Sequence, residues 1–173
     1  MAMTTANAAR GLAFIGFGEA GQSMASGLRE ANPDLPLHLY DLLFAGAEGD
    51  TMRARAAELK AVCHDNNPAA VAEAGIVLST VVAQSAQDVA KAAAAQIGPG
   101  QIFIDPNSAA PRTKQEVAEI LAPSGCTVLD GAILAPVPPH RHRVPILLCG
   151  PTSAEVTARL TAIRFNVEDG GEM

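Results

Sequence analysis

Short apolar runs alternate with longer amphipathic runs along almost the whole chain. The apolar runs are rich in Val, Ile and Leu, and they predict strands at 12–16, 36–41, 61–63, 76–82, 101–105, 125–129, 144–149 and 165–168. Apolar residues at helical spacing between these runs predict helices at 20–31, 50–60, 67–74, 85–97, 111–122 and 152–164. Buried strands alternating with helices are typical of parallel βαβ units. We therefore expect an α/β fold with a doubly wound, mostly parallel sheet covered by helices on both faces.

Capping and breaking residues mark several of the predicted helix ends. Three pairs have the spacing of a capping box at a helix start: Ser85 with Asp88, Thr113 with Glu116, and Thr152 with Glu155. Segment 131–145 departs from the pattern, because Pro136, Pro138, Pro139 and Pro145 are predicted to exclude regular structure there. The basic run 140–143 in its middle is expected as an exposed loop, with a clamp for a substrate carboxylate as the alternative.

Composition indicates one globular domain with an aliphatic core. The 173 residues include 49% hydrophobic and 17% charged residues, with 3% aromatics and no tryptophan. The net charge of −6 argues against a nucleic acid or an anionic membrane as partner. Residues 1–10 lack the apolar segment of a signal peptide and are expected as a flexible leader, which leaves 11–173 as the domain and predicts a cytoplasmic protein.

The three cysteines do not predict a metal site. Cys63, Cys126 and Cys149 lack metal-ligand spacing and lie within or beside apolar runs. We expect them as buried, reduced thiols, and we predict no bound metal.

The first predicted strand runs directly into Gly16-Phe17-Gly18-Glu19-Ala20-Gly21, a G-x-G-x-x-G turn that opens a predicted helix. In such a turn the first glycine permits the tight reversal and the second lets a pyrophosphate approach the backbone. The third lets the helix pack close to the strand. The free N–H groups and the positive dipole end of the helix then face the anion. A turn without a ligand is the alternative, since 15 of the 173 residues are glycine.

A carboxylate at the end of the second predicted strand supports the dinucleotide interpretation. Asp41 lies 20 residues after Gly21, where dinucleotide folds place the residue that binds the adenosine ribose. It favours NAD over NADP, because a carboxylate pairs with two ribose hydroxyls and repels a 2′-phosphate. No arginine occurs at 42–45, but Arg53 and Arg55 could reach back from the next helix, so NADP is the alternative.

Three motifs in order resemble the N-terminal domain of the β-hydroxyacid dehydrogenases, which include 3-hydroxyisobutyrate and 6-phosphogluconate dehydrogenases. They are the glycine turn at 16–21, the strand at 75–82, and segment 103–111, which is similar to the family's Asp-x-Ser-Thr-x-x-Pro motif. The resemblance implies a nicotinamide cofactor and hydride transfer from the hydroxyl carbon of a small β-hydroxyacid. The residues that we expect at the cofactor are Gly16, Phe17, Gly18, Glu19, Ala20, Gly21, Asp41, Val81, Val82, Asn107 and Ser108.

Asn107 and Ser108 are also expected to contact the substrate, with simple N-capping of the helix at 111–122 as the alternative. Asp105 is interpreted either as a residue that forms hydrogen bonds at a strand end or as a catalytic one. Where the family has Asp-x-Pro-Val-Ser-Gly-Gly, this chain has leucine at the serine place, in 130–136. The resemblance therefore does not extend to the identity of the substrate.

No catalytic residue is predicted. The family's catalytic lysine lies on a helix beyond this domain, within Lys-x-x-x-Asn, and Lys60, Lys91 and Lys114 have no such setting. Lys114 is expected in solvent on its helix. The family's all-helical second domain has no counterpart in this sequence, so we expect nucleotide binding without turnover by the chain alone. A stand-alone NAD-binding or sensing module is the alternative function, and a homodimer is left open.

Overall fold

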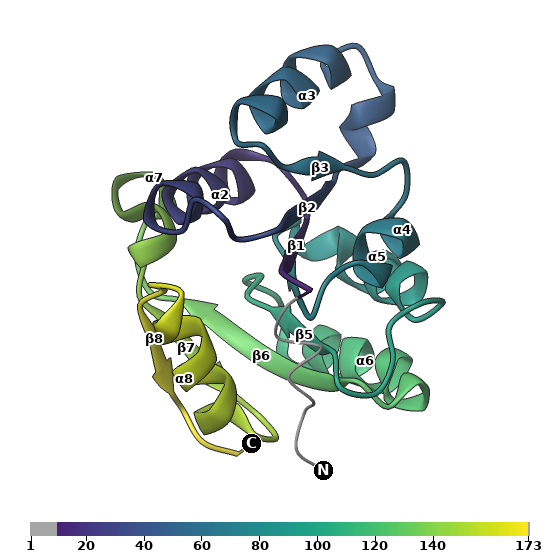
Figure 1. Cartoon of the computed structure of the whole chain (residues 1–173). Helices are drawn as coiled ribbons and strands as arrows, with labels where there is room; N and C mark the ends of the chain where they lie inside the picture. Colours follow the sequence, from purple (N-terminus) through teal and green to yellow (C-terminus); the bar gives the residue numbers. More distant parts are fainter. Residues whose placement is uncertain (1–9, 173) are drawn as a thin grey trace.

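The strands follow the predicted order along the chain. They are β1 (Leu12–Ile15), β2 (Leu37–Tyr40), β3 (Val62–Cys63), β4 (Ile76–Ser79), β5 (Ile102–Asp105), β6 (Thr127–Ile133), β7 (Ile146–Cys149) and β8 (Val167–Asp169). The computed structural model describes residues 10–172, and within them these strands form one sheet in the order β3-β2-β1-β4-β5-β6-β7-β8 (Figure 1). The order 3-2-1-4-5-6 is that of a dinucleotide-binding, doubly wound sheet, so the predicted fold class is confirmed.

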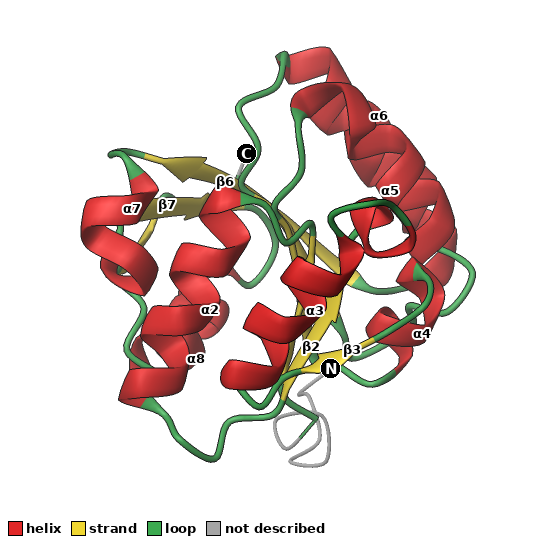
Figure 2. Ribbon diagram, turned by 90° about the horizontal axis from the view of Figure 1, so that it is seen from above, coloured by secondary structure: helices red, strands yellow, loops and turns green. Residues whose placement is uncertain are grey.

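Helices cover both faces of the sheet (Figure 2). One face carries α2 (Glu19–Ala31), α3 (Gly49–Glu58), α7 (Val137–His140) and α8 (Ser153–Ala162). The other carries α4 (Asn67–Ala72), α5 (Ala86–Ala93) and α6 (Pro111–Leu121). Successive side chains of a strand point to opposite faces, so Leu12 and Phe14 of β1 pack in the first core while Ala13 and Ile15 pack in the second. The sheet is therefore buried on both sides, as its apolar strands predict.

Each predicted strand and helix corresponds to one in the structure, but the predicted capping boxes do not form. Ser85 and Thr152 stand at N-cap positions without a side-chain hydrogen bond, and Thr113 lies inside α6. At the start of α4 the side chain of Asn66 accepts a hydrogen bond from the Ala69 N–H at 2.9 Å. These pairs have the spacing of a capping box, but the chain enters the helices with backbone angles other than those of a capped helix start.

The prediction for segment 131–145 was wrong in two respects. β6 continues to Ile133, and Pro138 and Pro139 lie in the first turn of α7, where a missing N–H costs no hydrogen bond. The segment then turns through the 3₁₀-helix η4 (Arg141–Arg143) without forming a helix that crosses the sheet. Because a parallel neighbour requires such a crossover, β7 pairs antiparallel with β6, and β8 pairs parallel with β7.

The basic run is not simply an exposed loop, because part of it docks on α2. Arg141 contacts Glu30 Oε2 through Nη1 and Ser26 Oγ through Nη2, each at 2.7 Å. His142 is buried and lies over Gly27, where a Cβ would overlap the imidazole ring. The expected exposure holds only for the first and last residues of the run. The docking replaces the missing crossover helix as cover for this face of the sheet.

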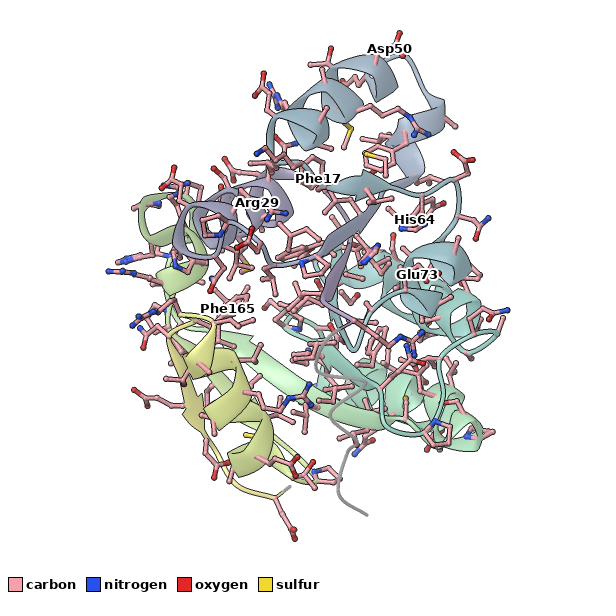
Figure 3. All side chains as sticks on the ribbon, in the orientation of Figure 1. Phe17, Arg29, Asp50, His64, Glu73 and Phe165 are labelled. Carbon is pink, nitrogen blue, oxygen red and sulfur yellow. The ribbon has the colours of Figure 1, made fainter. Side chains whose placement is uncertain are left out.

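A guanidinium group joins the ends of two helices on the same face. Arg29, labelled in Figure 3, donates to the carbonyl oxygen of Leu59 at the end of α3 (2.6 Å) and to that of Pro33 after α2. Carbonyl groups at the end of a helix lack intrahelical hydrogen-bond partners, and Arg29 donates to such groups at the ends of both helices. The side chain thereby fixes α3 against α2.

The remaining predictions concern the leader, the thiols and membranes. Residues 1–9 of the predicted leader lie outside the described residues, while Arg10 donates to the Ala72 carbonyl oxygen. Cys63, Cys126 and Cys149 are free thiols but half-buried rather than buried. From residue 10 to 172, no helix has both the length and the apolar character needed to cross a membrane, and no cluster of side chains could hold a metal ion.

Docking of η4 makes the fold sensitive to acid. Burial lowers the pKa of His142, and the cationic side chains of Arg143 and Arg141 lower it further, with Glu30 opposing them. The folded state thus favours the neutral imidazole. The stabilising contribution is complete above the ordinary pKa of histidine, about 6.5, and is lost as the pH falls from there through the lower pKa of the folded state.

The free energy of unfolding should decrease as the pH falls below 6.5, and we expect this decrease to be smaller in His142→Phe. Each proton by which the two states differ changes that free energy by up to about 1.4 kcal/mol per pH unit. Denaturant titrations between pH 7.5 and 5 measure the slope, with His140→Phe, at an exposed position, as control. Some slope should remain, since burial also lowers the pKa of His38 and His64. An identical slope in His142→Phe and the native chain contradicts the prediction.

Candidate functional site

The residues predicted at the cofactor follow four parallel strands at the edge of the sheet where those strands end. The glycine turn follows β1, Asp41 follows β2, Val81 follows β4, and Asn107 follows β5. β1 and β4 are neighbours in the sheet although the chain proceeds from β1 to β2, so this edge contains the point where the strand order reverses. Ligands of open α/β sheets bind in the crevice at such a point.

The three glycines of the turn have distinct geometric roles. Gly16 has φ +101°, and a Cβ there would overlap the Thr80 carbonyl oxygen on the neighbouring segment. A Cβ on Gly21 would overlap the Gly16 carbonyl oxygen, so the absence of a side chain lets α2 approach β1. Gly18 has an ordinary φ of −74°, and a Cβ there would meet nothing within 4 Å. The space beside Gly18 is therefore open.

The start of α2 offers unused hydrogen-bond donors at this open space. Gly18 is the N-cap of α2, and within the described part of the chain the N–H groups of Gly18, Glu19 and Ala20 have no acceptor. Several N–H groups that converge at the positive end of a helix dipole form an anion site. The carboxylate of Glu19 is exposed in the first turn and points to no partner among the described residues.

Phe17 supports the turn from inside. Its ring is buried and packs edge-on against Phe44 with centroids 6.2 Å apart. Its N–H donates to Asp41 Oδ2 at 2.6 Å, and its carbonyl oxygen accepts from Gln22 Nε2 at 2.8 Å. Phe17 therefore has no free backbone donor for a ligand, although its predicted place in the turn is correct.

Asp41 links the second strand to the glycine turn. Besides the bond from Phe17, its Oδ1 accepts from the Leu43 N–H at 2.8 Å, which caps the 3₁₀-helix η1 (Leu42–Ala45). The side chain is half-exposed and keeps further lone pairs available at the edge. Arg53 lies over the Phe44 ring at 5.1 Å from its centroid and pairs with Asp65, so it is engaged away from Asp41.

The loops after β4 and β5 are tied together by one amide. Asn107 Oδ1 accepts from the Val81 N–H at 3.0 Å, and Asn107 Nδ2 donates to Ser79 Oγ at 3.2 Å and to Asp105 Oδ1 at 2.5 Å. Asn107 is buried, whereas Ser108 is exposed. The N-cap of α6 is Ala110, so simple N-capping does not explain Asn107 and Ser108. Val82 is 65% exposed beside Val81.

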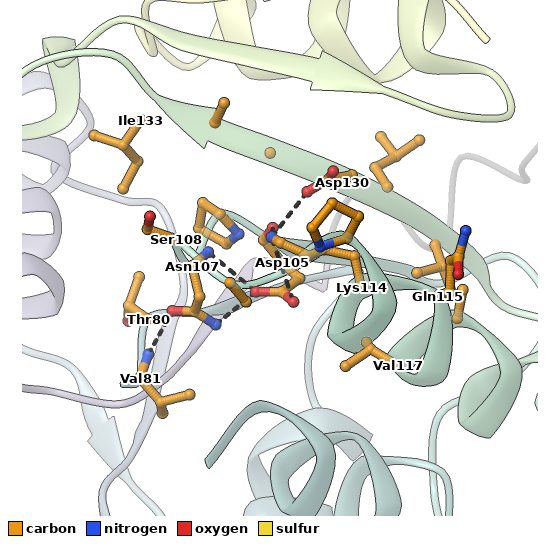
Figure 4. Close-up of a pocket in the computed structure, with 18 of the residues that line it drawn as sticks. Thr80, Val81, Asp105, Asn107, Ser108, Lys114, Gln115, Val117, Asp130 and Ile133 are labelled. Carbon is orange, nitrogen blue, oxygen red and sulfur yellow. Dashed lines mark hydrogen bonds and ion pairs between the residues drawn. The ribbon is translucent and has the colours of Figure 1, made fainter. Parts of the chain in front are cut away.

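A pocket of about 890 Å³ lies beside this amide, between β4, β5, β6 and α6. Predicted site residues Ala20, Val81, Asn107 and Ser108 line it. Figure 4 also shows two acidic residues and a lysine that the sequence analysis did not place there, Asp105, Asp130 and Lys114. The Lys114 ammonium contacts Asp130 Oδ1 at 2.8 Å and Asp105 Oδ2 at 3.5 Å.

The expectation that Lys114 is solvated was wrong, since its side chain is only 11% exposed. It belongs to the first turn of α6, which packs back over the end of β5. The available signal was the pair of aspartates at the ends of two consecutive strands, because carboxylates side by side attract a cation. Asp105 forms hydrogen bonds at the strand end, with Oδ1 accepting from the Asn107 N–H at 3.0 Å.

The strand order, the open glycine turn and the strand-end carboxylate define a dinucleotide-binding domain of the Rossmann type. Residues 11–157 match the family described as the NAD binding domain of 6-phosphogluconate dehydrogenase. The chain belongs to this family, which confirms the resemblance drawn from its motifs. No curated protein matches the chain.

Solved structures support the same fold. A conserved hypothetical protein from Sinorhizobium meliloti 1021 is 39% identical with a TM-score of 0.91, over 99% of this chain and 58% of that one. The 3-hydroxyisobutyrate dehydrogenase of Mycobacterium tuberculosis with L-serine is 21% identical with a TM-score of 0.78, over 93% and 54%. An imine reductase from Myxococcus stipitatus in complex with NADP⁺ is 17% identical with a TM-score of 0.76, over 93% and 55%. The chain thus spans little more than half the length of these proteins.

The glycine geometry predicts a large loss of stability at one position of the turn and almost none at another. Gly16→Ala should lower the free energy of unfolding by about 2–4 kcal/mol, from a positive φ combined with overlap on the Thr80 carbonyl. Gly18→Ser should change it by less than about 0.5 kcal/mol, because serine is a good N-cap and its Cβ enters open space. Urea titrations of both variants test this. Equal destabilisation by the two substitutions would contradict the assignment.

Proposed function

We propose that this chain binds NAD(H) and presents it to a small β-hydroxyacid within an oxidoreductase of the family. The observation that carries the proposal is the open turn at Gly18, where the N-terminal N–H groups of α2 have no acceptor in the described chain. A pyrophosphate is an anion of matching size and charge for such donors. Membership in the NAD-binding domain family supports this ligand, and the imine reductase complex with NADP⁺ supports a nicotinamide dinucleotide in general.

The two halves of the dinucleotide are then bound by different residues along the edge of the sheet. With the pyrophosphate at Gly16–Gly21, the adenosine ribose lies toward Asp41 after β2, and the nicotinamide half extends toward Val81, Val82 and Asn107 after β4 and β5. When bound, the nicotinamide supplies a carbon that accepts or returns a hydride. The pocket of about 890 Å³ beside Asn107 and Ser108 is the place for the substrate.

The chain's own residues bind and orient in this proposal, and none is assigned the proton transfer. Of the described residues that line the pocket, Lys114 is the basic one, and its ammonium is engaged by Asp105 and Asp130. Ser108 provides an exposed hydroxyl at the pocket, suited to a hydrogen bond with a substrate hydroxyl or carboxylate. We infer that the acid-base group of the reaction comes from outside these residues.

Gly18→Asp should abolish nucleotide binding without loss of stability. Aspartate is a favourable N-cap, but its charge would stand where the pyrophosphate binds. The expected result is an increase of at least about 100-fold in the Kd for NADH, which corresponds to about 2.7 kcal/mol. Calorimetric titration measures it, and Gly98→Asp, at a distant turn with equally open space, is the matched control. Undiminished binding by Gly18→Asp refutes the proposed site.

The charge of Asp41 should set the choice between the two nucleotides. We expect the native chain to bind NADH more tightly than NADPH, since the carboxylate repels a 2′-phosphate. Asp41→Asn keeps the size of the side chain and removes the charge, so the ratio of the two Kd values should move about tenfold toward NADPH, or about 1.4 kcal/mol. Titrations of both variants with both nucleotides decide it. Tighter binding of NADPH by the native chain would show that NAD is not preferred.

A further inference from the structure

Two carboxylates stand side by side at the floor of the pocket. Asp105 ends β5, Asp130 lies on β6, and the two residues pair in register across the strands. The side chain of Asp105 is only 3% exposed. Two carboxylates side by side repel each other, and a cation placed between them offsets that repulsion.

Lys114 provides that cation. Its ammonium donates to the Asp105 backbone oxygen at 2.5 Å and forms ion pairs with Asp130 Oδ1 at 2.8 Å and Asp105 Oδ2 at 3.5 Å. Neither of these two carboxylate oxygens has another partner in the described chain. Figure 4 shows the ammonium between the two acidic residues, on the α6 side of the pocket. The lysine therefore ties the two carboxylates together at the floor of the pocket.

The position of the Asp105 side chain matters for the amide next to it. Asp105 Oδ1 accepts from both the backbone N–H and the Nδ2 of Asn107. These bonds fix which end of the amide faces β5, so that Oδ1 faces the Val81 N–H at 3.0 Å. A chain of polar contacts thus runs from α6 through the end of β5 to the loop after β4.

From this chain of contacts we propose that Lys114 is a positioning residue for the nicotinamide half of the cofactor. Its ammonium holds the Asp105 carboxylate in place, and Asp105 orients the Asn107 amide that holds the loop at Val81. The adenosine half is expected to be unaffected, because Asp41 accepts from Phe17 and Leu43 and shares no hydrogen bond with this network in the described chain. The inference rests on the proposed function, since it assumes that the dinucleotide spans the edge from β2 to β5.

The test compares two ligands on the same protein, NADH and ADP-ribose, which lacks the nicotinamide. The ratio of their Kd values reports what the nicotinamide half contributes. In Lys114→Met we expect this ratio to fall about three- to tenfold, the equivalent of one hydrogen bond, while the Kd for ADP-ribose stays within about twofold. Lys114→Arg should keep most of the ratio, because a guanidinium can span both carboxylates. Lys91→Met, at an exposed lysine that pairs with Asp88, is the matched control and should change neither Kd.

A second measurement needs no nucleotide. In ¹⁵N-¹H spectra of the unliganded protein, Lys114→Met should shift the side-chain amide signals of Asn107 and the backbone signal of Val81, and leave that of Phe17 in place. If Lys114→Met does not fold, Lys114→Gln takes its place in both measurements.

Three results overturn the inference. They are an unchanged ratio in Lys114→Met, an equal weakening of both ligands, which indicates a merely structural role, and unmoved signals of Asn107 and Val81. If the native chain binds both ligands equally, the inference fails while the proposed nucleotide site stands. If the native chain binds neither ligand, the proposed function fails and the inference with it.

Discussion

The close approach of α2 to the ends of β1 and β4 is the constraint on which the rest of the site depends. It exists because Gly16 and Gly21 carry no Cβ, and either side chain would overlap a backbone carbonyl oxygen. Thr80 reinforces the approach by donating from Oγ1 to the Gly16 carbonyl oxygen at 2.7 Å. The helix start is thereby placed over the edge of the sheet with its N–H groups facing outward. Asp41 and Asn107 then hold the neighbouring loops around this fixed point.

Much of this arrangement could be predicted because it is local in sequence. Strand and helix periodicity, the glycine turn and the carboxylate after β2 all lie within short segments whose geometry follows from residue type. The direction of β7 could not be predicted in the same way, since it depends on whether segment 134–145 crosses the sheet. The segment docks on α2 instead, where His142 packs on Gly27, and these two residues are distant along the chain.

The charged floor of the pocket was missed for the same physical reason. Lys114 has no local pattern that distinguishes it from an exposed helix residue, and its burial follows from the lateral pairing of β5 with β6. Asp105 and Asp130 come from different segments, and only the sheet makes them neighbours. An ion pair of this kind depends on how the strands pair in the sheet and not on local propensity. It can be predicted only when the strand order and the strand ends are considered together.

The antiparallel direction of β7 determines where the described chain ends, and this matters for attaching the protein to a surface. Because β8 runs parallel to β7, the chain leaves β8 at the edge where β1 begins, opposite to the glycine turn (Figure 1). Gly171 lies there too, accepting from the Gly150 N–H at 2.9 Å. Both ends of the described chain thus lie on the side away from the pocket. Protein attached to a sensor surface through either end would present its nucleotide-binding edge to the solution.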